Sequence, residues 1–217
     1  MQFQAVFFDM DGTLINSEML WKEVEMSLVS KRGFKPELNF HLSLTGAVVS
    51  DSISAMKKRY GISDAPELLA KELEEGVLDK LATVSSLPYA EEILSYLTAR
   101  QIPIALVSNS SHKVIETSLS KQAWQHLIPK RFSADDVAFG KPAPDVYLYA
   151  AKSLGVEASK CLVLEDSLNG ARAARAANMT CYALPHSQDP SFAQIKQENP
   201  QHFHDLAEVL NYLISLD

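Results

Sequence analysis

The sequence predicts an α/β fold in which a doubly wound parallel sheet, a Rossmann-like core, carries an inserted helical cap subdomain. Short apolar runs alternate with segments whose apolar residues recur at intervals of three and four, as expected for buried strands between helices. After the first run the alternation stops, and roughly seventy residues hold helical patterns without a strand of comparable strength. A chain of 217 residues with 47% apolar residues can bury such a core and still supply a subdomain.

The first strand and the helical insertion are predicted near the start of the chain. Residues 3–8 are an apolar run that favours a buried strand. Three helices follow, over residues 17–32, 51–60 and 64–81, and glycines stop the first two. Asp64 is expected to cap the third helix. We therefore predict that residues 16–84 form the cap, and that residues 1–15 and 85–217 form the core.

The rest of the chain resumes the alternation of strands and helices after a return hinge at residues 82–88. Three further strands are predicted, at residues 102–107, 161–164 and 180–184. Helices are predicted over residues 89–100, 111–122, 144–154 and 169–177. A last helix begins at Asp205, which has a glutamate at capping-box spacing. Gly155 and Asn178 stand where two of these helices are expected to stop, because both residue types accept a left-handed backbone.

Composition argues against several classes of partner. The net charge of −7 speaks against binding to nucleic acid or to an anionic membrane surface. Cys161 and Cys181 lie in separate apolar runs, and we expect both to be reduced core residues. No basic leader or long apolar span precedes the first strand. We therefore expect a cytoplasmic monomer whose partner is a small molecule.

Acidic residues gather where the predicted strands end. Ligands of open parallel sheets bind outside the carboxyl ends of the strands, so four carboxylates, a hydroxyl and a lysine would meet at one edge. Such like charges persist only with a cation between them or a shared proton. An all-oxygen set without histidine or cysteine favours a hard cation, and Mg²⁺ is the usual one beside a phosphate. The candidates are Asp9, Asp11, Ser108, Asn109, Lys141, Glu165 and Asp166.

In this order the candidate residues resemble the four motifs of the haloacid dehalogenase-like hydrolase superfamily. The motifs are Asp9-Met10-Asp11-Gly12-Thr13, Ser108-Asn109, Lys141 and Glu165-Asp166. The helical insertion after the first motif resembles the mobile-cap branch of that superfamily. Within the branch, the stretches from Ser17 to Trp21 and from Gly140 to Asp145 are similar to sugar-phosphate phosphatases of the 2-deoxyglucose-6-phosphate type, and β-phosphoglucomutases share the same four motifs.

The resemblance implies a Mg²⁺-dependent phosphatase that hydrolyses small phosphorylated metabolites, such as sugar phosphates, through an aspartyl-phosphate. Asp9 would attack phosphorus, and Asp11 would first protonate the leaving group and then activate water. Asp9, Asp166 and the backbone carbonyl of Asp11 would hold Mg²⁺, with Glu165 as a further candidate ligand. The phosphate oxygens would be held by Ser108, by Lys141 and by the backbone N–H of Asn109 at the start of the next helix.

Three other classes of protein share some of these features. A calcium loop at Asp9 is excluded, since an EF-hand needs an acid or amide where Thr13 stands and a glutamate where Leu20 stands. A receiver-like signalling module shares the acid cluster and the lysine but needs no lid. A phosphosugar mutase uses a cap-helix histidine where this chain has Trp21. Trp21 itself is equally compatible with packing between helices and with lining the substrate chamber.

Three positions depart from the pattern of the superfamily, and one of them is Asn178, which stands where the superfamily usually has a glycine stop. The superfamily often has glycine after the hinge proline, whereas here Pro88 is followed by Tyr89. Many caps place an arginine after the glycine that precedes the second cap helix, whereas here Gly46 is followed by Ala47. We therefore expect loose specificity toward the far end of the substrate.

Overall fold

A five-stranded parallel sheet forms the centre of the computed structural model, which describes residues 3–216 apart from the side chain of Ala82. The strands are β1 (Ala5–Phe8), β2 (Ile104–Ser108), β3 (Arg131–Ser133), β4 (Cys161–Glu165) and β5 (Thr180–Ala183). Their order in the sheet is β3-β2-β1-β4-β5, and all neighbouring pairs are parallel. β1 lies between β2 and β4, so the chain order reverses at its carboxyl end, where open α/β sheets bind ligands. The predicted doubly wound fold is confirmed.

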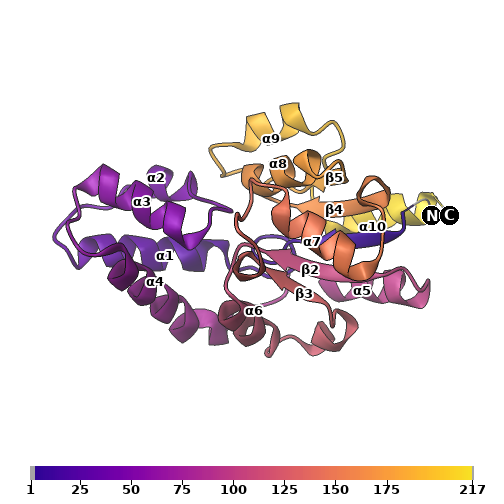
Figure 1. Ribbon diagram of the computed structural model, residues 1–217, viewed down its shortest axis with the longest axis horizontal. Coiled ribbons are helices and arrows are strands. Elements are labelled where there is room, and N and C mark those ends of the chain that lie inside the picture. Colours follow the sequence, from indigo (N-terminus) through magenta and orange to yellow (C-terminus); the bar gives the residue numbers. More distant parts are fainter. Residues whose placement is uncertain (1–2, 217) are drawn as a thin grey trace.

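Helices cover both faces of the sheet (Figure 1). On one face, α5 (Ala90–Ala99) and α10 (Leu206–Ser215) pack with α6 (His112–Leu119) in the larger apolar cluster. On the other face lie α7 (Asp145–Leu154) and α8 (Leu168–Ala176), and α9 (Phe192–Glu198) packs beside α8. In β1, Val6 and Phe8 point to the first cluster while Ala5 and Phe7 point to the second. This alternation follows from the pleat of a strand buried on both faces.

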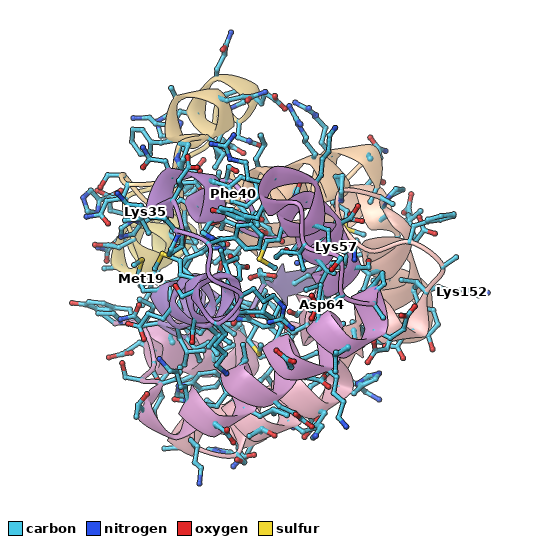
Figure 2. All side chains as sticks on the ribbon, turned by 90° about the vertical axis from the view of Figure 1, so that its left-hand side faces the viewer. Met19, Lys35, Phe40, Lys57, Asp64 and Lys152 are labelled. Atoms are coloured by element: carbon cyan, nitrogen blue, oxygen red, sulfur yellow. The ribbon has the colours of Figure 1, made fainter. Side chains whose placement is uncertain are left out.

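Four helices lie to one side of the sheet, at the left of Figure 1. They are α1 (Glu18–Ser30), α2 (Leu38–Leu42), α3 (Val49–Tyr60) and α4 (Pro66–Lys80). Figure 2 looks onto them and shows Met19, Phe40 and Asp64 on the near face. Helices α1 and α4 approach closely at Gly76, where a Cβ would lie 2.6 Å from Val24 Cγ1. All four helices fall within residues 16–84, the range predicted for the cap.

Two linkers connect these helices to the sheet, and they pair with each other. Ile15 forms an antiparallel bridge with Ser86, Asn16 N–H donates to Ser85 O at 2.9 Å, and Leu87 N–H donates to Leu14 O at 2.9 Å. The second linker ends at Tyr89, whose φ of 65° lies in the left-handed region. The two linkers between the sheet and α1–α4 therefore run side by side as a short antiparallel pair.

Several elements differ from the prediction. The sequence does not predict β3, because Phe132 is its only apolar side chain among three residues. It also misses α2 and α9, which are only 5 and 7 residues long. The prediction that Asp64 caps a helix is wrong: α4 begins at Pro66 with Ala65 as its N-cap, and Asp64 accepts hydrogen bonds from Arg32 instead.

Smaller features of the fold are short 3₁₀ helices, the two cysteines and the ends of two helices. Short 3₁₀ helices occur at η1 (Leu81–Thr83), η2 (Ala123–Leu127), η3 (Ala134–Asp136) and η4 (Ala158–Lys160). Both cysteines are free; Cys161 is buried as predicted, whereas Cys181 is only half-buried. Gly155 and Asn178 stop their helices with left-handed backbones, at φ 66° and 59°. Among the described residues, no helix combines the length and apolar character needed to cross a membrane.

Candidate active site

Asp9 and Asp11 follow β1 at the middle of the carboxyl edge of the sheet. Asp9 extends the strand pairing, because its N–H donates to Leu164 O at 3.0 Å. The chain then turns at Gly12, where φ is 76° and a Cβ would lie 2.1 Å from Asp166 Oδ2. Both the positive φ and the close approach require glycine at this position. The Asp-x-Asp-Gly sequence thus places the loop after β1 directly against the loop after β4.

Three side chains donate hydrogen bonds to the Asp11 carboxylate. Ser17 and Trp21, at the start of α1, both donate to Oδ1, with Trp21 Nε1 at 3.1 Å. Ser110, in the loop after β2, donates to Oδ2 at 2.9 Å. The indole of Trp21 therefore touches the site directly. Asp11 joins the first of the four outlying helices to the edge of the sheet.

Lys141 is a fully buried ammonium group held between two carboxylates. Its Nζ donates to Asp9 Oδ1 at 2.5 Å, to Glu165 Oε1 at 2.5 Å and to Val107 O at 2.7 Å. Burial alone would lower the pKa of Lys141, but the carboxylates of Asp9 and Glu165 outweigh it and raise the pKa above its usual value. All three donors of the ammonium are used, so Lys141 is charged and fixed in direction.

Glu165 is surrounded by donors that hold it in place. Oε1 accepts from Lys141 and from the Tyr147 hydroxyl at 2.6 Å, and Oε2 accepts from Ser167 Oγ at 3.1 Å. Burial and the nearby charge of Glu165 raise the pKa of Tyr147 well above its usual value, so that phenol stays a donor. Gly170 makes room for the carboxylate, because a Cβ there would lie 1.9 Å from its Cδ.

Three buried carboxylates form a cluster that fits a metal ion. One oxygen each from Asp9, Glu165 and Asp166 can be chosen so that all lie within 4.8 Å of one another. Burial raises the pKa of Asp9 well above its usual value, against the attraction of Lys141. Burial, followed by the charges of Asp9 and Glu165, raises the pKa of Asp166 as well. A hard divalent cation would relieve this repulsion, and carboxylate oxygens are the ligands that Mg²⁺ prefers.

Ser108 and Asn109 end β2 next to the cluster. Ser108 Oγ accepts from Ser110 N–H at 3.0 Å. Asn109 bridges two loops: its Nδ2 donates to Gly46 O at 2.9 Å and Lys141 O at 3.0 Å, and its Oδ1 accepts from Lys141 N–H at 2.8 Å. The expectation that Asn109 opens the next helix is wrong, because α6 begins at His112 with Ser111 as its N-cap.

The loop between α2 and α3 lies directly over this edge of the sheet. Gly46 has φ 71°, and a Cβ there would lie 2.4 Å from Ser167 Oγ. Asn169 Nδ2 donates to Thr45 O at 3.5 Å, and Ser111 Oγ donates to Glu74 of α4. These contacts narrow the cavity to a volume of about 60 Å³. That is well below the roughly 300–1,000 Å³ of small-molecule sites, so in this arrangement the cavity has space only for small groups.

The structure brings the predicted site residues together. All of them except Glu165 line this cavity, and Glu165 contacts Lys141 beside it. Sequence reasoning missed Ser110, Ser167 and Tyr147. The two serines directly follow predicted motifs, which was an available signal. The sequence gives no such signal for Tyr147, because its spacing in a predicted helix indicates only a core residue.

Comparison with known proteins adds a family match. The chain matches the haloacid dehalogenase-like hydrolase family over residues 6–184. It is 30% identical to the bifunctional riboflavin kinase/FMN phosphatase of Arabidopsis thaliana over 83% of this chain, but it spans only 48% of that protein. It likewise spans 18% of SUPPRESSOR OF QUENCHING 1 from the same plant, at 32% identity over 83% of this chain. Hexitol phosphatase B of Escherichia coli K12 is 31% identical, over 88% of this chain and 89% of that protein.

Solved structures share the fold over nearly the whole chain. A hydrolase of the same family from Deinococcus radiodurans R1, solved with bound phosphate and sodium, is 27% identical with a TM-score of 0.75, covering 96% of this chain and 93% of that chain. The β-phosphoglucomutase of Clostridium difficile has a TM-score of 0.82 at 20% identity, covering 98% and 99% of the two chains. At that identity the second likeness concerns the fold alone.

Proposed function

The chain belongs to the haloacid dehalogenase-like hydrolase family, and we propose that it is a Mg²⁺-dependent phosphatase that acts on small phosphorylated metabolites, above all sugar and polyol phosphates. The observation that carries the proposal is the buried edge of the sheet, where Asp9, Asp11 and Asp166 meet the charged Lys141 beneath a covering loop. Phosphate-ester hydrolysis needs a nucleophile, a proton donor and charge compensation in a site closed to bulk water. This edge offers a residue for each.

The names of the relatives support the substrate class. Hexitol phosphatase B is similar to this chain over most of both lengths, and the Deinococcus structure holds phosphate. The cavity, at about 60 Å³, is smaller than a hexitol phosphate, so we expect the loop that covers it to open further when such a substrate binds. The net charge of −7 favours a small substrate over a nucleic acid.

In the first chemical step, Asp9 acts as the nucleophile. A carboxylate oxygen of Asp9 bonds to phosphorus while the bond from phosphorus to the leaving oxygen breaks, and Asp11 gives its proton to that oxygen. Ser17, Trp21 and Ser110 hold the Asp11 carboxyl group in place. The product of this step is an aspartyl-phosphate and a free alcohol.

In the second step, Asp11 acts as the base. It takes a proton from water, the water oxygen bonds to phosphorus, and the bond from phosphorus to Asp9 breaks, which releases inorganic phosphate and restores both aspartates. Mg²⁺, held by Asp9 and Asp166 together with the backbone carbonyl of Asp11, would offset the charge of the phosphoryl group. We assign Glu165 to holding Lys141 in position, because its oxygens already accept three side-chain donors.

The groups that we expect to bind phosphate lie on the side of the site next to β2. Lys141 places a buried positive charge against Asp9, and the Ser108 hydroxyl lines the same cavity. Asn109 would contribute its backbone N–H while its side chain ties the cap loop to the lysine loop. These groups would stabilise the charge that develops on the phosphoryl oxygens.

We propose that residues 16–84 work as a mobile cap. The Asn109 side chain holds the loop at Gly46 over the cavity, and we expect this loop to lift when substrate enters. The paired linkers provide a single place about which the four helices can turn. A receiver module that only accepts phosphate needs no such cover, which favours the hydrolase.

The test is phosphate release from p-nitrophenyl phosphate and from hexose and hexitol 6-phosphates. We expect release with Mg²⁺, none with EDTA, and recovery when Mg²⁺ is added back. Asp9→Asn should keep the fold and lose activity to below about a hundredth of the wild-type kcat, since an amide cannot attack phosphorus. Full activity in EDTA, or no release from any of these esters, would contradict the proposal.

A further inference from the structure

Two charged residues of α1, Lys22 and Glu25, are buried in the cavity wall although the proposed chemistry uses neither. Their exposed fractions are 3% and 2%, and both line the cavity that holds Asp9 and Lys141. Burying charged groups is costly unless they find partners. Their position on the same wall as Trp21 therefore calls for a ligand-binding explanation.

Lys22 has donors to spare. Its ion pair with Glu25 is long, with Nζ 3.8 Å from Oε1, which exceeds hydrogen-bond distance. Among the described residues, this ammonium group donates no hydrogen bond. An ammonium group carries three N–H donors. The Lys22 ammonium group is therefore buried at the cavity wall with N–H donors that are still available to a ligand.

Glu25 is anchored from behind by the buried His41 and by the half-buried Tyr60 and Phe40. Its Oε2 lies 3.0 Å from His41 Nδ1, and His41 Nε2 lies 3.3 Å from the Tyr60 hydroxyl. Phe40, labelled in Figure 2, packs edge-on against both rings. Because a carboxylate can only accept, His41 Nδ1 is the donor toward Glu25, and the Tyr60 hydroxyl behind His41 also accepts from Glu37 N–H at 3.1 Å. This chain fixes Oε2 and leaves Oε1 as an acceptor on the side of Lys22.

We propose that Lys22 and Glu25 bind hydroxyl groups of the leaving group, so that the enzyme selects polyhydroxylated phosphates over simple alkyl and aryl phosphates. The inference rests on the proposed phosphatase function. A hydroxyl both donates and accepts, so it matches an ammonium donor beside a carboxylate acceptor. A second anionic group fits less well, because Glu25 already compensates Lys22 and the cavity wall holds further acids at Asp11 and Glu18.

The spacing along α1 matches this role. Trp21 reaches Asp11, where the leaving oxygen is protonated, and Glu25 lies one helical turn further along. Residues four apart on a helix have Cβ atoms about 5–6 Å apart. That separation corresponds to a hydroxyl a few carbons away from the phosphate ester.

The variants Lys22→Met and Glu25→Gln test the inference. We expect kcat/KM for glucitol 6-phosphate to fall at least about tenfold, the cost of losing a hydrogen bond to a charged group. For p-nitrophenyl phosphate, which has no such hydroxyls, the loss should stay below about threefold. Tyr60→Phe, which removes only the hydroxyl behind His41, should raise KM for the polyol phosphate and leave its kcat unchanged.

Matched controls come from α1 and from its C-cap residue, Lys31. Glu23→Gln and Lys31→Met change exposed charges, of which Glu23 pairs with Lys80 outside the cavity. These two variants should leave kcat/KM unchanged for both glucitol 6-phosphate and p-nitrophenyl phosphate. Equal losses for both substrates in Lys22→Met and Glu25→Gln, or no loss in either, would overturn the inference.

The substrate provides an independent test should a variant fail to fold. The wild-type enzyme should prefer glucitol 6-phosphate to hexyl phosphate, which lacks the hydroxyls, by at least about tenfold in kcat/KM. Equal rates would overturn the assignment of Lys22 and Glu25 while leaving the phosphatase function intact. Absence of release from every ester, including p-nitrophenyl phosphate, would instead contradict the phosphatase function.

Discussion

Glu165 and Asp166 are neighbours in the chain, yet their carboxylates have different surroundings. Glu165 accepts hydrogen bonds from Lys141, Tyr147 and Ser167, which use most of its capacity. Asp166 accepts none from the side chains that the structure describes, and it faces Gly12 and the cavity. The two acids therefore differ in what they can still bind, although both belong to the buried carboxylate cluster.

This difference predicts unequal effects on metal dependence. In Asp166→Asn, the Mg²⁺ concentration needed for half-maximal activity should rise at least about tenfold, because a ligand charge is lost. In Glu165→Gln, the Mg²⁺ dependence should shift much less while kcat falls, since Lys141 loses an anionic partner. Titrating phosphate release against Mg²⁺ measures both. An unchanged Mg²⁺ requirement in Asp166→Asn would remove that residue from the ligand set.

The acids of the site were predictable because they directly follow apolar runs, and parallel strands bring their ends to one edge. The directions of the side chains were not. That Asn109 points to Gly46 and Lys141, or that Tyr147 reaches Glu165 from α7, depends on contacts between segments far apart in the sequence. Lys22 and Glu25 were not predicted as site residues, because their burial also depends on contacts between distant segments, which the sequence does not show.

Among the elements, the second linker contains a residue in an unfavourable backbone conformation. Tyr89, at the N-cap of α5, has φ 65°, where side chains with a Cβ are strained by roughly 1 kcal/mol. Tyr89→Gly should therefore be more stable than Tyr89→Ala, which removes the ring but keeps the strain. We expect a melting temperature about 2–4 °C higher for the glycine variant. Equal melting temperatures, measured by calorimetry, would contradict this reading of the linker.

Helices α8 and α9 are joined by an ion-pair network whose effect depends on pH. Glu198 accepts from Arg172 and Arg175, and the hydrogen bond from Arg172, with further donors, lowers the pKa of Glu198 to about 2 from the usual 4.5. A lowered folded pKa stabilises the protein above pH 4.5, and the benefit is lost as the pH falls toward about 2. For a partly exposed carboxylate this amounts to about 1 kcal/mol.

Glu198→Gln should therefore lower the melting temperature by about 2–4 °C near neutral pH. The difference from wild type should stay constant down to about pH 5 and shrink at lower pH. Thermal melts of both proteins across this range check the sign. A difference that grows on acidification would show that Glu198 is not stabilised as a carboxylate.

Long periodic elements were predictable, and short ones were not. The buried apolar strands β1, β2 and β4 were predicted to within a few residues, because each is a continuous apolar run. β3 joins the sheet through its backbone pairing with β2 at Leu106, Val107 and Ser108, which its side chains do not encode. Likewise α4 starts where Pro66 fixes the backbone, not where Asp64 offers a cap.

At the scale of the whole molecule, the four outlying helices and the sheet both line the candidate active site. The contacts of the Gly46 loop and of Glu74 with Ser111 describe a closed arrangement. In this arrangement Trp21 donates to Asp11, so we expect the proposed general acid to be fully held only when α1 lies against the sheet. The helices that cover the candidate site therefore also supply a residue that contacts Asp11.

The same arrangement predicts hydrolysis rather than phosphoryl return to a sugar. Trp21 Nε1 is a donor that contacts Asp11, and an indole has no basic nitrogen to move a proton between sugar hydroxyls. With β-glucose 1-phosphate, free phosphate should therefore appear and glucose 6-phosphate should not. Following both products in one incubation is decisive. Formation of glucose 6-phosphate faster than free phosphate would identify a mutase.

The central claim is that Asp9 carries the phosphoryl group, and trapping that intermediate tests it most directly. In Asp11→Asn, p-nitrophenyl phosphate should still phosphorylate the enzyme, because its leaving group needs no proton, while the second step lacks its base. Mass spectrometry of the acid-quenched protein should then show one phosphoryl group, mapped to Asp9 and removed by hydroxylamine. The same variant with Asp9→Asn added should show none. Phosphate release without a phosphorylated Asp9 at any time, or a label on another residue, would contradict the account.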